Sequence, residues 1–330
     1  MQITESDFLY YFNSIITKGK KGNTYKFALA RFLLDYSYAL DEAHIRNNIA
    51  DNKLETIDLT IIAKAFLKYY WHQICKYKIK QNYNTEKPPL IVKIMHDIFG
   101  KKYIPESFES MPKEKIDNAQ KEILKRCFVD VIPQFQNIPE GIKVSSMKIF
   151  YEYDKHFLYV KPTALKFFKE NYLLSSKAII LEWGKFLEKT NLGLPMLISK
   201  IESIKRHRGS LEKVKLILLN YFDTCFYCNN TLSSEKQMIH LDHFIPWPYV
   251  FEDELWNLVL TCRVCNLKKH SSLPSEKFIY KLVERNNEYS NTIGSLKKSL
   301  IRLDPGTNYE RTIIKHYQNC LDYGFTVVRI

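Results

Sequence analysis

The sequence predicts a mostly helical α+β protein: an N-terminal helical body with a small β-hairpin, then a compact metal-stabilised module, then C-terminal helices. Three observations support this prediction. Apolar side chains recur at three- and four-residue steps over long stretches, which is the period of an amphipathic helix. β-branched and aromatic residues alternate over 144–162, as in a hairpin. Four of the seven cysteines gather between residues 223 and 269, which is typical of a small metal-binding module.

The helical period gives the order of the elements. The paired prolines at 88 and 89 suit a loop and a helix start. We expect helices over 25–45, 57–79, 87–100, 163–174 and 177–191, another within 113–130, the hairpin over 144–162, and two or three further helices after residue 272. Three domains are expected: a mainly helical domain over 1–200 for recognition, oligomerisation or regulation, a cysteine-bearing domain over 201–275, and a helical extension over 276–330 that packs on the rest.

The charge of the chain indicates a polyanionic partner. Lys and Arg number 49 against 36 Asp and Glu, which gives a net charge of +13 over 330 residues. Such a surplus favours nucleic acid or an anionic membrane surface, although other basic proteins carry it too. Glycine is scarce, at 10 residues, and no phosphate-loop pattern occurs, so nucleotide hydrolysis through a P-loop is unsupported.

The cellular compartment follows from hydropathy and cysteine usage. No run approaches the roughly 18 apolar residues that cross a bilayer. The number of cysteines is odd, and Cys75, Cys127 and Cys320 are scattered, which argues against a disulfide framework and for a reducing compartment. We therefore expect a cytoplasmic protein without membrane association.

The cysteine cluster consists of two C-x-x-C pairs, Cys225 with Cys228 and Cys262 with Cys265. Two such turns can direct four thiolates at one ion, and the soft ligands and tetrahedral geometry favour Zn²⁺ over iron. Four thiolates leave no open coordination position, so the ion would be structural. Binding it would supply about 10–16 kcal/mol toward folding of the segment. Chance pairing or two redox motifs is the competing interpretation.

An acid and a histidine, Asp242 and His243, lie between the two pairs in a stretch that alternates like a short strand. Taken alone, they could be an exposed polar pair at a strand end. Asn257 precedes a second apolar run, and Asn266 directly follows the last cysteine. His240 fits packing or the substrate side better than zinc, because four cysteines already fill that site. The zinc could thus gather Asp242, His243 and Asn266 around one small volume.

These residues together resemble the HNH, or ββα-metal, nucleases, and in particular the four-cysteine branch that includes McrA-like restriction enzymes and phage endonuclease VII. The matching pieces are the two C-x-x-C pairs, DH at 242–243, N at 257 and N at 266. The resemblance covers about 50 residues and implies that 201–275 is an HNH nuclease domain. The helical body carries no family signature, although helices followed by an HNH module occur in bacterial defence nucleases.

The resemblance implies a role for each residue. His243 would be the general base, and Asp242 and Asn266 would hold one divalent ion, Mg²⁺ or Mn²⁺, against the scissile phosphate. Asn257 would brace the loop between the strands and so orient the histidine. The pattern departs from H-N-H by ending in asparagine, whose neutral oxygen suits Mg²⁺ better than zinc.

The chemistry is coherent without the family name. Phosphodiester hydrolysis needs a nucleophile, charge relief on the phosphate and help for the leaving oxygen. Histidine side chains titrate near neutral pH, and general-base catalysis typically contributes about 10²–10⁴-fold. A hard ion can stabilise the developing charge and the departing 3′ oxygen.

Basic residues near the module are candidates for nucleic-acid contact or for solvated faces, and the sequence leaves both open. They are Arg263, Lys268 and Lys269 beside the last cysteines, with His270, and the upstream run of Lys205, Arg206, His207 and Arg208. The aromatic residues Trp247, Phe251 and Trp256 fit packing of a small zinc module better than base stacking.

The leading hypothesis is a metal-dependent endonuclease that hydrolyses DNA in bacterial restriction or anti-phage defence, with RNA as another possible substrate. A homodimer or a partner protein of a defence system is expected, because one HNH site cuts one strand. A junction-resolving or homing nuclease is one alternative. A zinc-stabilised nucleic-acid-binding module without catalysis is another.

Overall fold

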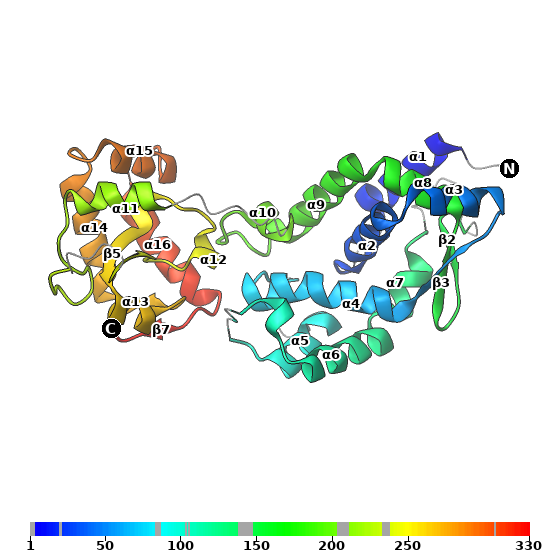
Figure 1. Cartoon of the computed structure of the whole chain (residues 1–330), viewed down its shortest axis with the longest axis horizontal. Helices are drawn as coiled ribbons and strands as arrows, with labels where there is room; N and C mark the ends of the chain where they lie inside the picture. The colour runs from blue at the N-terminus through cyan, green and yellow to red at the C-terminus, as the bar shows by residue number, and fades with distance from the viewer. Residues whose placement is uncertain are drawn as a thin grey trace.

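The computed structural model describes residues 4–19, 22–82, 87–102, 104, 106–137, 148–202, 211–232, 238–306 and 308–330. The described chain forms two groups of elements joined end to end (Figure 1). Helices α1 to α9 with one sheet lie at one end, and α11 to α16 with two short sheets lie at the other. The N- and C-termini mark opposite ends of the molecule. The mostly helical α+β class is confirmed.

The helical body begins with α1 (Glu5–Lys18), whose N-terminus is closed by a capping box between Thr4 and Asp7. The single helix expected over 25–45 is instead two, α2 (Tyr25–Ala39) and α3 (Glu42–Ala50). Leu40 is extended between them, and the Asp41 carboxylate accepts a hydrogen bond from the Ala43 backbone N–H at 3.1 Å. This N-cap starts a new helix where the apolar period alone indicated continuity.

The segment expected as one helix over 57–79 also differs. It contains the end of strand β1 (Glu55–Asp58), then α4 (Leu59–Tyr70) and the π-helical turn η1 (Trp71–Lys76). Asp58 caps α4 by accepting from the Thr60 N–H at 2.7 Å. β1 pairs with a strand a hundred residues later, so its local sequence gave little sign of it.

The remaining elements of the body follow the predicted order. They are α5 (Leu90–Phe99), η2 (Phe108–Ser110), α6 (Lys113–Arg126), α7 (Phe128–Gln134), α8 (Pro162–Glu170) and α9 (Tyr172–Glu188). The hairpin is confirmed as β2 (Tyr151–Tyr153) and β3 (Phe157–Val160), and 144–147 lie outside the described residues. β3 is central in an antiparallel sheet of order β1-β3-β2.

The second group of elements contains the cysteine module. Helix α10 (Leu197–Glu202) packs on α9 and η1 of the body. The second group comprises α11 (Glu212–Leu219), β4 (Ile239–His243), α12 (Trp247–Val250), η4 (Leu255–Asn257), β5 (Leu258–Cys262), α13 (Arg263–Lys269), β6 (Leu273–Pro274), α14 (Lys277–Tyr289), α15 (Gly294–Leu303), α16 (Tyr309–Asp322) and β7 (Val327–Val328). β4 and β5 are antiparallel, whereas β6 and β7 are a short parallel pair. No helix in the described chain is long and apolar enough to span a membrane.

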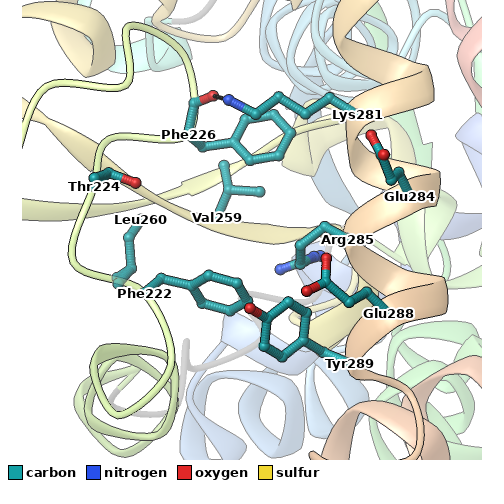
Figure 2. Close-up of a pocket in the computed structure, with 10 residues that line it drawn as sticks. All are labelled: Phe222, Thr224, Phe226, Val259, Leu260, Lys281, Glu284, Arg285, Glu288 and Tyr289. Carbon is teal, nitrogen blue, oxygen red and sulfur yellow. Dashed lines mark hydrogen bonds between the residues drawn. The ribbon is translucent and has the colours of Figure 1, made fainter.

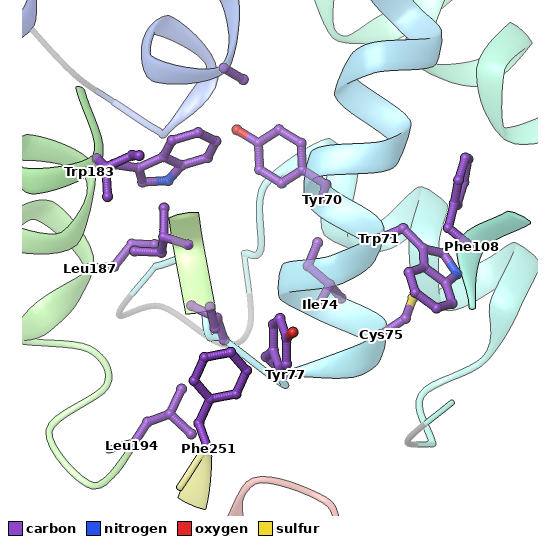
Figure 3. Close-up of a cluster of buried hydrophobic side chains, with 14 of the residues drawn as sticks. Tyr70, Trp71, Ile74, Cys75, Tyr77, Phe108, Trp183, Leu187, Leu194 and Phe251 are labelled. Atoms are coloured by element: carbon purple, nitrogen blue, oxygen red, sulfur yellow. The ribbon is translucent and has the colours of Figure 1, made fainter. Parts of the chain in front are cut away.

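The two groups meet at a buried seam. Phe251, just after α12, packs edge to face on Tyr77, just after η1, with ring centroids 5.4 Å apart, and Leu194 is buried beside them (Figure 3). Lys200 on α10 is fully buried, and its ammonium donates to the carbonyl of Tyr249 on α12 at 2.5 Å. The seam therefore fixes α12, in the loop between β4 and β5, against the helical body.

Candidate functional site

The four cysteines converge on one point. Their sulfur atoms all lie within 4.8 Å of one another, and Cys228 and Cys262 are 3.9 Å apart. A tetrahedral zinc site with Zn–S bonds of about 2.3 Å requires sulfur–sulfur distances of about 3.8 Å, so the cluster fits Zn²⁺. Cys262 ends β5 and caps α13, and its sulfur accepts from the Cys265 N–H at 3.5 Å.

The protonation of these thiols also fits a bound cation. Burial raises the pKa of Cys225, but backbone N–H groups of Cys228, Cys262 and Tyr227 lower it to about 7. Burial and the neighbouring thiols raise the pKa of Cys265 instead. Adjacent thiolates repel, so the four can be deprotonated together only around a positive ion. The four-cysteine cluster is thus suited to zinc.

The hairpin predicted between the cysteine pairs is present. Asp242 pairs with Val259 and His243 with Leu258 across β4 and β5. α13 follows β5 directly, so the order is strand, strand, helix. Because successive residues of a strand face opposite sides, Asp242 and His243 diverge, and each has a different set of partners.

Asp242 is held in a buried polar cluster. Tyr227, from the turn of the first cysteine pair, donates its hydroxyl to Asp242 Oδ2 at 2.7 Å. Lys269 Nζ lies 3.1 Å from Oδ1 and 3.0 Å from Oδ2, and it also donates to the His243 carbonyl at 2.7 Å. Burial, and then the Asp242 charge, raise the pKa of Tyr227 well above its usual value. The hydroxyl therefore stays protonated as a donor.

His243 is half-buried and pairs with a residue that the sequence interpretation missed. Its Nε2 lies 2.8 Å from Oδ1 of Asp253, in the loop between α12 and η4. If Nε2 carries the proton, Nδ1 is left as the acceptor. The run Glu252-Asp253-Glu254 just before η4 was the only signal in the sequence, and it does not single out the middle acid.

Asn257 braces the loop that follows His243. Its Oδ1 accepts from the Ile245 N–H at 2.8 Å, and its Nδ2 donates to the Ile245 carbonyl at 2.9 Å. Its own carbonyl accepts from the Phe244 N–H at 2.8 Å. The side chain is buried, so its place in the structure is that of a support for the loop.

Asn266 lies one turn before Lys269 on α13, so the two side chains share a helix face. Because Lys269 reaches Asp242 and the His243 carbonyl, this face is the one toward β4. Among the residues that the structure describes, no partner hydrogen-bonds the Asn266 amide. Of the three residues expected around one volume, Asp242 pairs with Lys269 and His243 pairs with Asp253. Asn266 is a half-buried amide on the helix face that carries Lys269, and no contact joins it to the other two among the described residues.

The basic residues proposed for nucleic acid differ in placement. Arg263, Lys268 and His270 are exposed on and after α13. Lys269 is a correction: its side chain is only 1% exposed and its ammonium is paired with Asp242, so it is not presented to a phosphate backbone. Lys205, Arg206, His207 and Arg208 lie outside the described residues.

The aromatic residues of the module pack, as expected. Phe251 and Trp256 are buried, and Trp247 lies 4.5 Å from Phe251 between ring centroids. His240, half-buried on β4, does not belong to the cysteine cluster.

Side chains of α14 face β5 and the first cysteine turn (Figure 2). Lys281 on α14 donates to the Phe226 carbonyl at 2.6 Å, within the first cysteine turn. The buried Arg285 donates to the carbonyls of Leu258 and Trp256, each at 2.9 Å. Burial lowers the pKa of Arg285 to about 9. Ser299 on α15 accepts from the Trp256 N–H at 3.1 Å.

Comparison with known families finds one match in each group of elements. Residues 225–275 match the family described as HNH endonuclease, and residues 6–122 match a domain of unknown function, DUF8808. No curated protein and no solved structure matches the chain. The first match spans the cysteine cluster, the β4–β5 hairpin and α13.

Proposed function

Because residues 225–275 form an HNH endonuclease domain with a four-cysteine cluster, we propose that this protein is a metal-dependent endonuclease that hydrolyses DNA phosphodiester bonds. The family match supports a nuclease-type function with a nucleic-acid substrate. The proposed hydrolysis of DNA is supported by the polar side chains at the end of β4. The His243 imidazole is held by Asp253, and the Asp242 carboxylate is held by Tyr227 and Lys269.

His243 is the proposed general base. Asp253 holds the ring through Nε2, so that Nδ1 can take the proton from an attacking water. Asn257 keeps the loop after β4 in place through both bonds to Ile245. Asp253 is therefore a positioning residue, because it would act through the orientation and tautomer of His243.

Asp242 and Asn266 are the proposed ligands of the catalytic divalent ion, Mg²⁺ or Mn²⁺. Within the described chain, Asp242 Oδ1 accepts one hydrogen bond, from Lys269, so it retains a lone pair for a cation. One carboxylate, one amide oxygen and the oxygens of a DNA phosphate match the way Mg²⁺ is usually held. When bound, such an ion supplies charge relief on the phosphate and on the leaving oxygen.

The DNA-binding face proposed here is α13 with its exposed Arg263 and Lys268. The net charge of +13 supports broad phosphate contact. A role in bacterial restriction or anti-phage defence rests on the analogy of a helical body joined to an HNH domain. A homodimer or a partner protein would provide the second cut.

A second candidate function is a zinc-stabilised nucleic-acid-binding module without catalysis. One observation favours it: the Asp242 carboxylate is buried and already paired with the ammonium of Lys269 at 3.0 Å, where a catalytic ion would have to compete.

Plasmid nicking separates the two. Supercoiled plasmid is incubated with Mg²⁺ or Mn²⁺ and the parent protein, His243→Ala or His240→Ala. His240 is the matched control, because it is a half-buried histidine on the same strand. The nuclease predicts nicking by the parent and by His240→Ala, and loss of about 10²–10⁴-fold in His243→Ala with DNA binding retained. If all three proteins bind and none cuts any substrate, the binding module is correct.

A further inference from the structure

A cavity lies at the seam between the helical body and the second group of elements, α11 to β7, which is called the nuclease part below because it contains the HNH match. It has a volume of about 360 Å³ and lies between the segment after η1, helix α5 and the C-terminal end of α16. This volume falls within the roughly 300–1,000 Å³ typical of small-molecule sites. The charged and aromatic residues that line it are Lys78, Lys80, His96, Lys101, Asp322 and Tyr323.

The lining is strongly basic. Among the described residues that form the cavity, Asp322 is the only acid, against three lysines and a histidine. None of the three lysines forms an ion pair with a described carboxylate. Lys78 donates instead to the Lys101 carbonyl at 2.8 Å, and Lys80 lies over the Tyr323 ring, 4.7 Å from its centroid. Like charges that line one cavity repel one another, and an anion bound among them would relieve this repulsion.

The backbone that presents two of these lysines is fixed. Asn191 bonds both the N–H and the carbonyl of Lys80, each at 2.8 Å. The Ile79 N–H donates to the Gln73 carbonyl at 2.8 Å. Lys78, which directly precedes these two residues, has φ of +57°, a left-handed conformation that is unfavourable for a lysine. The chain thus holds Lys78 and Lys80 in place at a conformational cost.

The ionisation of the cluster agrees with this geometry. Burial lowers the pKa of Lys78 to about 8. Burial, and then the charges of Lys78 and Lys101, lower the pKa of His96. A positive charge on Lys78 is therefore disfavoured by burial, and one on His96 by burial and by the neighbouring lysines; a bound anion would relieve both effects.

We propose that this cavity binds a nucleotide through its phosphate groups, with Lys78, Lys80 and Lys101 as the phosphate contacts. Lysine is a common phosphate ligand, and a cavity of about 360 Å³ accommodates a molecule of nucleotide size. The nucleotide is either free or part of a DNA strand. Because Asp322 and Tyr323 belong to the nuclease part and the lysines to the helical body, the ligand bridges the two.

Binding is tested in the His243→Ala protein, so that the result does not depend on cleavage. The probes are pyrophosphate and ATP without added metal, measured by isothermal titration calorimetry, and a labelled 20-nucleotide DNA, single- or double-stranded, measured by fluorescence anisotropy at several salt concentrations. The pocket variant is Lys80→Gln with Lys101→Gln, both exposed. The matched control is Lys121→Gln with Lys125→Gln, two exposed lysines on α6.

If the ligand is a free nucleotide, the affinity for pyrophosphate or ATP should fall by about tenfold or more in the pocket variant and stay within about twofold in the control. If the ligand is part of a DNA strand, only the pocket variant should lose DNA affinity, and its slope of log affinity against log salt should be smaller by about 1.4–1.8. Equal binding of every probe by both double variants, or no binding of any probe, overturns the proposal. Cleavage by the parent is unaffected by that result and remains a separate question.

Discussion

The hydroxyl of Tyr227 donates to the carboxylate of Asp242 at 2.7 Å, and this bond joins the cysteine cluster to the end of β4. Tyr227 lies between the two cysteines of the first pair, so the turn that carries the sulfur ligands also carries the tyrosine. From the other side, α13 begins at Cys262 and reaches the same carboxylate through Lys269. A single metal can therefore orient Asp242 from two directions.

Tyr227→Phe removes the bond while keeping the ring. We expect the free energy of unfolding to fall by about 1–3 kcal/mol, because the buried carboxylate loses a donor. Zinc content should stay at one ion per chain, and nicking should decline. Thermal melts, metal analysis and a plasmid assay on one preparation test this. Loss of zinc in the variant would show that the tyrosine supports the cysteine turn itself.

Cys262→Ser should lose the proposed zinc ion and unfold the segment around it, because the sulfur belongs to the four-cysteine cluster and also caps α13. Cys127→Ser is the matched control, a buried cysteine in the helical body outside the cluster. Zinc per chain is measured by mass spectrometry of the metal. One full equivalent in Cys262→Ser would refute the four-sulfur site.

Lys269→Gln and Lys268→Gln are neighbouring substitutions with opposite expected results. Lys269 is buried against Asp242, so its loss leaves an uncompensated buried charge and should cost about 3–5 kcal/mol of stability. Lys268 is exposed, so its loss should leave stability within about 0.5 kcal/mol and weaken DNA binding. Denaturant unfolding and anisotropy separate the effects. If the Lys269→Gln protein is as stable as the parent but binds DNA more weakly, Lys269 contacts the DNA phosphates after all.

Asp253→Asn should slow nicking while DNA affinity stays the same, because the amide can present its N–H to His243 and favour the unproductive tautomer. Glu254→Gln is the control, since Glu254 pairs with Arg302 on α15 instead. Single-turnover rates at saturating protein are the measurement. If both variants cleave at the parent rate, Asp253 does not position the base.

Acid should destabilise the nuclease part through His316. Burial, and then the charges of Lys200 and Lys315, lower the pKa of His316 to about 4 from the ordinary 6.5. Between pH 4 and 6.5 the unfolded chain therefore binds a proton on His316 that the folded chain does not. The free energy of unfolding should be unaffected by His316 above about pH 6.5 and should fall by up to about 3 kcal/mol as the pH decreases toward 4. His316→Phe keeps an aromatic ring against Trp256 and should flatten this decline in melts between pH 7.5 and 5. If stability falls with pH as steeply in His316→Phe as in the parent, other titrating groups cause the decline.

Short-range patterns in the sequence were enough to predict the features that depend on local spacing. The C-x-x-C pairs predicted the sulfur cluster, and alternation predicted β4 and the hairpin of β2 and β3. Asn257 was expected to brace the loop, and its bonds to Ile245 are of that kind.

Features that depend on distant contacts were missed. β1 forms only against β3, and the partners of Lys269 and Tyr227 are 27 and 15 residues away in the sequence. Lys268 and Lys269 are adjacent, and nothing in the local sequence indicates which of the two side chains is buried. Helix α2 ended early because Asp41 caps α3, a local signal that the apolar period masked.

The hydrogen bonds of Arg285 and Ser299 with the backbone of η4 and β5 limit where the chain can be truncated. A fragment cut at residue 275, where the family similarity ends, would leave three main-chain groups near Trp256 without their partners. The smallest fragment that keeps these bonds therefore runs through α15, and recombination that moves the HNH module between proteins would have to carry these helices along.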